Sequence, residues 1–158
     1  MTDLGILARR TIEAEIVKPI FEAMRAALGE APARAILKTA IRRAAIASGA
    51  AMAAKAQAKG LDGFKAVFPL WTQDDALEVE VLRDEPGVFE FNVTRCRYAE
   101  TYRAMGLEGL GDVLSCDRDG AFCEGFDPSI ELTRTQTIMG GASHCDFRYC
   151  QRTDKAAD

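Results

Sequence analysis

Hydrophobic positions near the start of the chain recur with the period of an α-helix. Between residues 11 and 28 they follow spacings of three and four, at Val17, Phe21, Met24 and Leu28, with Ile16 and Ile20 widening the stripe. Gly29 is a typical helix stop. The pattern predicts one amphipathic helix that ends near Leu28.

A second helix is predicted from about Pro32 to Lys59, and it is rich in alanine. Its expected buried face consists of Ile36, Leu37, Ile41, Ala44 and Met52. Small side chains let another helix approach closely, so this surface suits packing inside the chain or a homodimer. We interpret residues 1–60 as a helical scaffold, because they contain no cysteine or histidine.

The hydrophobic period then changes to two, which is typical of strands. A short helix is expected over 61–68. After it, Leu77, Val79 and Val81 alternate with acidic residues. Further along, Phe89, Phe91 and Val93 alternate with polar residues in the same way. The turn sequence 84–87 lies between the two runs. The pattern predicts an antiparallel hairpin with one buried face.

Further helices are expected over 95–105, with Thr94 as N-cap, over 107–114 and over 119–124. Strands over 130–139 and 144–150 complete a second hairpin. The predicted fold class is α+β, with N-terminal helices packed on an antiparallel sheet of two hairpins and intervening helices. Residues 1–158 are expected to form a single domain whose candidate chemistry lies in 75–150.

Composition narrows the classes of function. The net charge of −4 offers no basic surface for nucleic acid, and no apolar run approaches the roughly 20 residues that span a bilayer. The five cysteines are an odd number, and the N-terminus lacks a signal-peptide pattern. We therefore expect a cytoplasmic protein with reduced thiols, no membrane partner and a small-molecule substrate.

Cys96 is the most suggestive single residue. In the first turn of a helix capped by Thr94, and between Arg95 and Arg97, its thiol would have a lowered pKa. Glu100, four residues later, would share its helical face. This pair suits a nucleophile with an acid/base partner, or two metal ligands; the alternative is a buried cysteine that only packs.

A second cluster is His144, Cys145 and Asp146. On a strand, Cys145, Phe147 and Tyr149 would face the core, and His144, Asp146 and Arg148 the other side. His144 follows a turn and could point inward, or it could lie at the surface. With Cys116, the residues Cys96, His144 and Cys145 could hold Zn²⁺ or Fe²⁺, although their spacing matches no standard finger.

Three arginines, Arg95, Arg134 and Arg148, are candidates to bind a substrate carboxylate, because a guanidinium group fits it in a bidentate way. Each of them could equally form a surface ion pair.

Three segments together resemble the L-2-amino-thiazoline-4-carboxylic acid hydrolase family. They are FNVTRCRYAE (91–100), LSCDRD (114–119) and ELTRTQTIM with GASHCDFR (131–148). The resemblance covers roughly residues 75–150. It implies a hydrolase that opens a small cyclic amidine, such as 2-amino-thiazoline-4-carboxylate, to N-carbamoyl-cysteine, or a related cyclic amide.

Two mechanisms are compatible with this resemblance. In one, Cys96 attacks the amidine carbon while Glu100 or His144 moves protons. In the other, a bound metal activates water. The alternative to an enzyme is a small-molecule, redox or metal-sensing domain with a cysteine-lined pocket.

Overall fold

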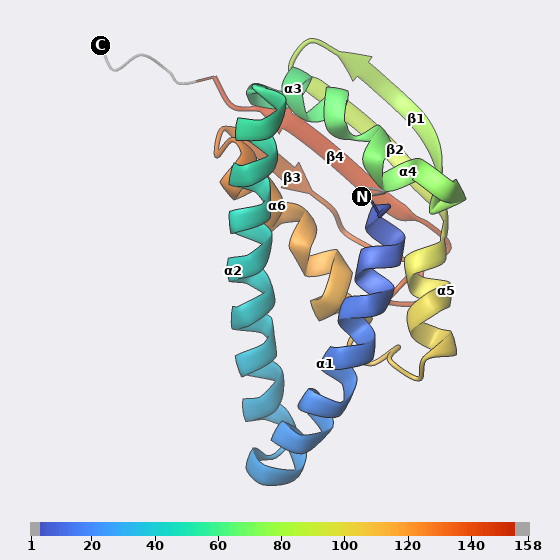
Figure 1. The fold of residues 1–158 in the computed structure, drawn as a ribbon. Coiled ribbons are helices and arrows are strands. Elements are labelled where there is room, and N and C mark those ends of the chain that lie inside the picture. Colours follow the sequence, from blue (N-terminus) through green and yellow to red (C-terminus); the bar gives the residue numbers. More distant parts are fainter. Residues whose placement is uncertain (1–3, 154–158) are drawn as a thin grey trace.

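The computed structural model describes residues 4–153, and it is an α+β structure in which helices cover one face of a four-stranded antiparallel sheet (Figure 1). The helices are α1 (Ile6–Leu28), α2 (Glu30–Ala56), α3 (Gly60–Val67), α4 (Pro69–Thr72), α5 (Arg97–Ala104) and α6 (Asp117–Phe126), with a 3₁₀ turn at Gln73–Asp75 and a π-helical turn, η2, at Asp112–Cys116. The strands are β1 (Leu77–Glu85), β2 (Val88–Cys96), β3 (Ile130–Thr133) and β4 (Cys145–Gln151).

The two predicted hairpins lie side by side in the sheet, in the order β1-β2-β4-β3. Pairing of β2 with β4 sets Phe91 opposite Phe147, Phe89 opposite Tyr149 and Val93 opposite Cys145. All six of these side chains are buried, because strand periodicity places them on the same face. The prediction that Cys145, Phe147 and Tyr149 face the core is confirmed.

Helices α1 and α2 form a long antiparallel hairpin that projects beyond the sheet (Figure 1). Gly29 has a φ of 91°, and its N–H donates to the Arg25 carbonyl at 2.9 Å, which ends α1 at the predicted position. The buried face of α2 runs in steps of four residues: Ala33, Leu37, Ile41, Ala45 and Gly49. Helix α2 therefore presents one narrow stripe to the rest of the molecule.

Some residues predicted to be buried are exposed. They are Ile16, Ile20 and Leu28 on α1, Ile36 and Ala44 on α2, and Val81 on β1. The helical hairpin contacts the body along one side only, and β1 is an edge strand, so neither element buries its whole apolar surface. The homodimer expected from the alanine-rich helix stays a prediction.

The alanine-rich helix has an internal role, because α2 and α6 pack backbone to backbone. A Cβ atom on Gly49 of α2 would overlap the Phe122 carbonyl, and one on Gly125 of α6 would overlap the Ile46 carbonyl. Only glycine fits at both positions. This contact holds α6 between α2 and the sheet (Figure 1).

Three predicted boundaries are wrong. Helix α5 begins at Arg97, not Arg95, because Thr94 still belongs to β2 and Cys96 is the N-cap. The predicted strand over 130–139 ends at Thr133, because the Asp146 carboxylate accepts hydrogen bonds from the N–H groups of Thr135 and Gln136, each at 2.9 Å. These side-chain bonds replace strand pairing with a loop that continues to His144, so that β4 begins at Cys145. Likewise, the helix expected over 107–114 is a single turn at 108–110 followed by η2.

Among the helices of residues 4–153, none combines the length and the apolar character that crossing a bilayer requires.

We predict that Gly125→Ala destabilises the protein by about 3 kcal/mol, because an added methyl group would push α6 away from α2. This corresponds to a fall in Tm on the order of 10 °C. Gly120→Ala is the matched control, since Gly120 lies in the same helix and a Cβ there meets nothing within 4 Å. Thermal unfolding followed by circular dichroism compares the two variants; equal melting temperatures would contradict the packing argument.

Candidate active site

A cavity of about 90 Å³ lies between the inner face of the sheet and helices α1, α3, α4 and α6. This volume is smaller than that of an engineered cavity of about 150 Å³ that binds benzene, so the cavity has room for no more than one small ring. Most of its wall is apolar, and its aromatic residues are Phe64, Phe68, Trp71, Phe91, Tyr98, Phe122, Phe147 and Tyr149.

The aromatic wall is a connected shell. Phe68 packs on Phe91 with ring centroids 4.8 Å apart, and Phe64 packs on Tyr149 at 4.9 Å. Trp71 meets Phe122 edge-on at 5.0 Å. These contacts join α3 and α4 to the sheet and to α6, and they exclude water from one side of the cavity.

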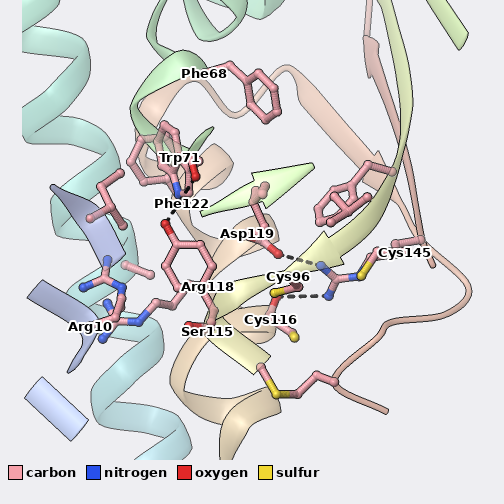
Figure 2. Close-up of a pocket in the computed structure, with 18 of the residues that line it drawn as sticks. Arg10, Phe68, Trp71, Cys96, Ser115, Cys116, Arg118, Asp119, Phe122 and Cys145 are labelled. Carbon is pink, nitrogen blue, oxygen red and sulfur yellow. Dashed lines mark hydrogen bonds and ion pairs between the residues drawn. The ribbon is translucent and has the colours of Figure 1, made fainter. Parts of the chain in front are cut away.

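An ion pair between Asp119 and Arg134 interrupts this wall (Figure 2). Arg134 Nη1 donates to Asp119 Oδ2 at 2.6 Å, and Nη2 donates to the Cys116 carbonyl at 3.0 Å. The guanidinium group also lies over the Phe147 ring, 5.0 Å from its centroid. Helix α6 and the loop after β3 thus meet at this pair.

Asp119 is the one carboxylate that lines the cavity. Its side chain is 25% exposed although protein surrounds it, so the exposed part faces the cavity. Among residues 4–153 nothing donates a hydrogen bond to Oδ1. Burial raises the pKa of Asp119 above its ordinary value, although Arg134 favours ionisation. A buried carboxylate with a free oxygen is a typical proton acceptor.

Three thiols also line the cavity: Cys96, Cys116 and Cys145. Burial raises the pKa of Cys96 to about 11, and it raises the pKa values of Cys116 and Cys145 as well. Two of the sulfur atoms accept backbone hydrogen bonds, Cys96 from Ala99 at 3.4 Å and Cys145 from Ile138 at 3.2 Å. These thiols are therefore protonated at neutral pH.

The expected lowering of the Cys96 pKa is wrong. As N-cap, Cys96 meets one helix N–H, but the apolar surroundings disfavour its thiolate more strongly. The expected partner Glu100 is exposed and forms an ion pair with Arg95, 2.8 Å apart. Arg95 and Glu100 therefore form a surface ion pair, and neither residue lines the cavity.

The other sequence candidates lie outside the cavity wall. His144 is half-buried, and its Nδ1 lies 2.9 Å from the Ser143 hydroxyl. The pKa of Asp146 is held below its ordinary value, because hydrogen bonds from Thr135 and Gln136 outweigh the cost of burial. Arg148 donates to the carbonyls of Phe91 and Phe147 and to the Asn92 side chain. Asp146 thus fixes the loop after β3, and Arg148 joins β4 to the neighbouring central strand β2.

The residues expected to bind Zn²⁺ or Fe²⁺ do not form a ligand set. Within residues 4–153, no group of three or more His, Cys, Asp or Glu side chains has a geometry that could hold a metal ion. Cys96, Cys116 and Cys145 line the cavity with protonated thiols, whereas His144 is not among its lining residues. The expected donors therefore do not fit a metal centre.

Three charged residues of the cavity were not named as site residues from the sequence: Arg118 and Asp119, although they belong to the motif segment 114–119, and Arg10. Helical spacing could have indicated one of them, because Ser115, Asp119 and Phe122 recur at four and three residues and share a face. Arg10 gave no signal, since it comes from the opposite end of the chain.

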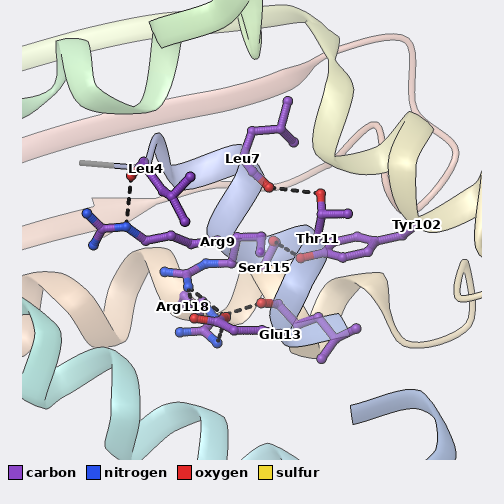
Figure 3. Close-up of polar contacts among 10 residues, drawn as sticks. Leu4, Leu7, Arg9, Thr11, Glu13, Tyr102, Ser115 and Arg118 are labelled. Atoms are coloured by element: carbon purple, nitrogen blue, oxygen red, sulfur yellow. Dashed lines mark hydrogen bonds and ion pairs between the residues drawn. The ribbon is translucent and has the colours of Figure 1, made fainter. Parts of the chain in front are cut away.

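Arg10 and Arg118 belong to a polar network on the α1 side of the cavity. Arg118 donates from Nε to the Leu114 carbonyl at 2.7 Å and from Nη2 to Glu13 at 3.1 Å (Figure 3). Arg10 Nη1 contacts both Glu13 oxygens at 2.7 Å. Nearby, the hydroxyl groups of Tyr102 and Ser115 lie 2.8 Å apart. This network connects α1, α5 and α6.

These features define a small α+β protein with a largely apolar pocket between the helices and the sheet. The family model for L-2-amino-thiazoline-4-carboxylic acid hydrolase matches residues 9–149, so the protein belongs to this family. The match includes the N-terminal helices as well as the motif-bearing part, and it supports a hydrolase-like role.

No curated protein matches the chain. A similar solved structure is the phenol-responsive sensory domain of the transcription activator PoxR with phenol. That structure has a TM-score of 0.51 and 14% sequence identity, and the similarity covers 96% of this chain and 76% of the other. At this identity the similarity concerns the fold alone.

We predict that only one thiol reacts rapidly with Ellman's reagent at pH 7.5. Cys150 is the exposed cysteine, whereas Cys96, Cys116, Cys123 and Cys145 are buried or half-buried. Burial raises the pKa values of these four thiols. Cys150→Ser should remove the fast phase, and unfolding in guanidinium should restore reaction of the remaining four. A fast thiol that persists in Cys150→Ser would mean that the cavity stabilises a thiolate.

Proposed function

We propose that the protein hydrolyses a small cyclic amidine, such as 2-amino-thiazoline-4-carboxylate or a related heterocycle, inside the aromatic cavity. Membership of the family supports the class of reaction. A cavity with room for one small ring and a wall of aromatic faces suits a planar five-membered heterocycle.

This proposal depends on the position of the Asp119 carboxylate in the cavity wall. An amidine presents N–H groups along one edge, and a carboxylate accepts such donors well. The free Oδ1 of Asp119 faces the cavity, while Oδ2 is held by Arg134 at 2.6 Å. Because burial raises its pKa, the carboxylate is a stronger base than an exposed aspartate.

In the proposed reaction, water attacks the amidine carbon and Asp119 accepts a proton from that water. Asp119 passes this proton to the ring nitrogen, which becomes an N–H group of the product. The tetrahedral intermediate then breaks its bond from carbon to ring sulfur. Its hydroxyl proton goes to the departing sulfur, and the carbon keeps the oxygen as a carbamoyl group. One water is consumed for each ring opened, and no oxidant or reductant takes part.

The roles predicted for Cys96, Cys145 and His144 as a catalytic set stay untested. The raised pKa of Cys96 disfavours attack by its thiolate. We therefore assign proton transfer to Asp119 and regard the three cavity thiols as weakly polar parts of the wall. Arg134 is the positioning residue that fixes the Asp119 carboxylate.

Ligand sensing without turnover is the second candidate. It is favoured by the fold shared with a phenol-responsive sensory domain and by the protonated state of the cavity thiols. A sensor would bind a small planar ligand stoichiometrically and leave it intact, whereas an enzyme would consume many equivalents.

We predict that Asp119→Asn lowers kcat/KM for 2-amino-thiazoline-4-carboxylate at least about 100-fold, because the amide cannot accept the proton. The asparagine oxygen can still accept a hydrogen bond from Arg134, so the fold should persist. Chromatographic quantification of N-carbamoyl-cysteine measures the rate.

Asp117→Asn is the matched control, since Asp117 lies on the same helix but pairs with Lys38 at 3.3 Å and does not line the cavity. Its activity should stay within about threefold of wild type. Full activity in Asp119→Asn would sink the proposed role, and wild-type protein that binds the substrate without any product would favour a sensor.

The pH dependence supplies a separate test of Asp119. A general base works when ionised, so kcat/KM should rise with pH through the pKa of Asp119. That midpoint should lie above the ordinary aspartate value of about 3.8, because burial outweighs the opposing effects of Arg134 and Arg10. In a pH–rate profile the wild type should show this raised midpoint, and the midpoint of Asp117→Asn should lie lower, because the negative charge of Asp117 helps to raise the pKa of Asp119. A wild-type acid limb at or below 3.8 would contradict the assignment.

A further inference from the structure

The charges that line the cavity do not balance. Arg10, Arg118 and Arg134 line it, but among residues 4–153 Asp119 is its only acidic lining residue. Asp119 and Arg134 neutralise each other at 2.6 Å. Glu13, which does not line the cavity, is the one carboxylate in contact with both Arg10 and Arg118. One positive charge therefore remains on the α1 side.

Both arginines are largely buried. The side chain of Arg118 is 12% exposed and that of Arg10 is 17% exposed, whereas Glu13 is 44% exposed. Burial and the neighbouring Arg10 lower the pKa of Arg118. An arginine nevertheless stays charged in proteins, so the excess charge persists in a poorly solvated place.

Donor groups remain for a ligand. Hydrogen bonds engage Nη1 of Arg10 and the Nε and Nη2 atoms of Arg118. Within the described part of the chain, Nη1 of Arg118 and Nη2 of Arg10 donate to no acceptor. Figure 2 shows these two arginines close together on one side of the cavity, with Asp119 and Cys145 toward the other.

We propose that Arg10 and Arg118 form a carboxylate-binding subsite at the α1 side of the cavity. This inference rests on the proposed function, because it takes the substrate to be a ring that carries a carboxylate. The carboxylate of that ring would lie on the side of the cavity opposite Asp119. The cavity would then recognise a small planar heterocycle at two ends, its N–H edge at Asp119 and its carboxylate at the two arginines.

This assignment differs from the arginines that the sequence suggested. Arg95 pairs with Glu100 at the surface, and Arg148 bonds to backbone and Asn92. Arg134 lines the cavity, but its two terminal nitrogens already bind Asp119 and the Cys116 carbonyl. Arg10 and Arg118 are the cavity arginines with unused terminal nitrogens.

A binding experiment tests the subsite without any turnover. Trp71 is the only tryptophan and it lines the cavity, so its fluorescence should report occupancy. The probes are 2-aminothiazole-4-carboxylate, an aromatic analogue, and 2-aminothiazole-4-carboxamide, in which an uncharged amide of similar size replaces the carboxylate. Wild type should bind the carboxylate at least about 10-fold more tightly than the carboxamide.

Arg10→Gln and Arg118→Gln should each reduce this preference to about threefold or less while the carboxamide affinity changes little. Two variants are used because Arg118 also holds the Leu114 carbonyl, and far-UV circular dichroism checks that both fold. Arg42→Gln is the control, because it removes one charge from an exposed ion pair with Glu124 outside the cavity.

Equal affinity for the two probes in wild type, or no saturable quenching by either, would overturn the subsite. An unchanged preference in a folded Arg10→Gln variant would do so as well. A charge preference that depends on Arg10 and Arg118 supports the subsite even if wild type hydrolyses nothing, in which case the proposed hydrolase function alone fails.

Discussion

The direct contact between α2 and α6 is the constraint on which the rest of the structure depends. Gly49 and Gly125 let each backbone approach the carbonyl groups of the other helix, and no larger residue fits there. Helix α6 is therefore fixed at one depth above the sheet. Asp119, Arg118 and Phe122 come from this helix, so the same contact determines where the cavity wall and its charges lie.

Burial then decides the chemistry of the cavity. It raises the pKa values of three thiols and of Asp119, which disfavours the thiolates and makes the carboxylate more basic. It also surrounds Arg10 and Arg118, which share one carboxylate partner, Glu13. The aspartate base and the carboxylate-binding subsite that we propose both rest on this one physical effect.

A fold does not determine a function, and a similar arrangement of helices and strands occurs in a phenol-responsive sensory domain. The distinguishing features are the charged groups inside the cavity. A purely apolar pocket could retain a ring by its aromatic wall alone. Burying an Asp–Arg pair and two further arginines costs free energy. A polar ligand that binds these groups, as we propose, would offset that cost.

The sequence by itself determined the α+β class, the two hairpins and the inward face of β4, because hydrophobic periodicity is a local property. It also contained the motifs of the family. It could not identify Arg10 or Trp71 as neighbours of Asp119, since they are far apart in the chain. Nor could it show that Cys96 is a protonated N-cap while Glu100 binds Arg95, because the surroundings of a side chain set its pKa and its partner. Tertiary packing decided both.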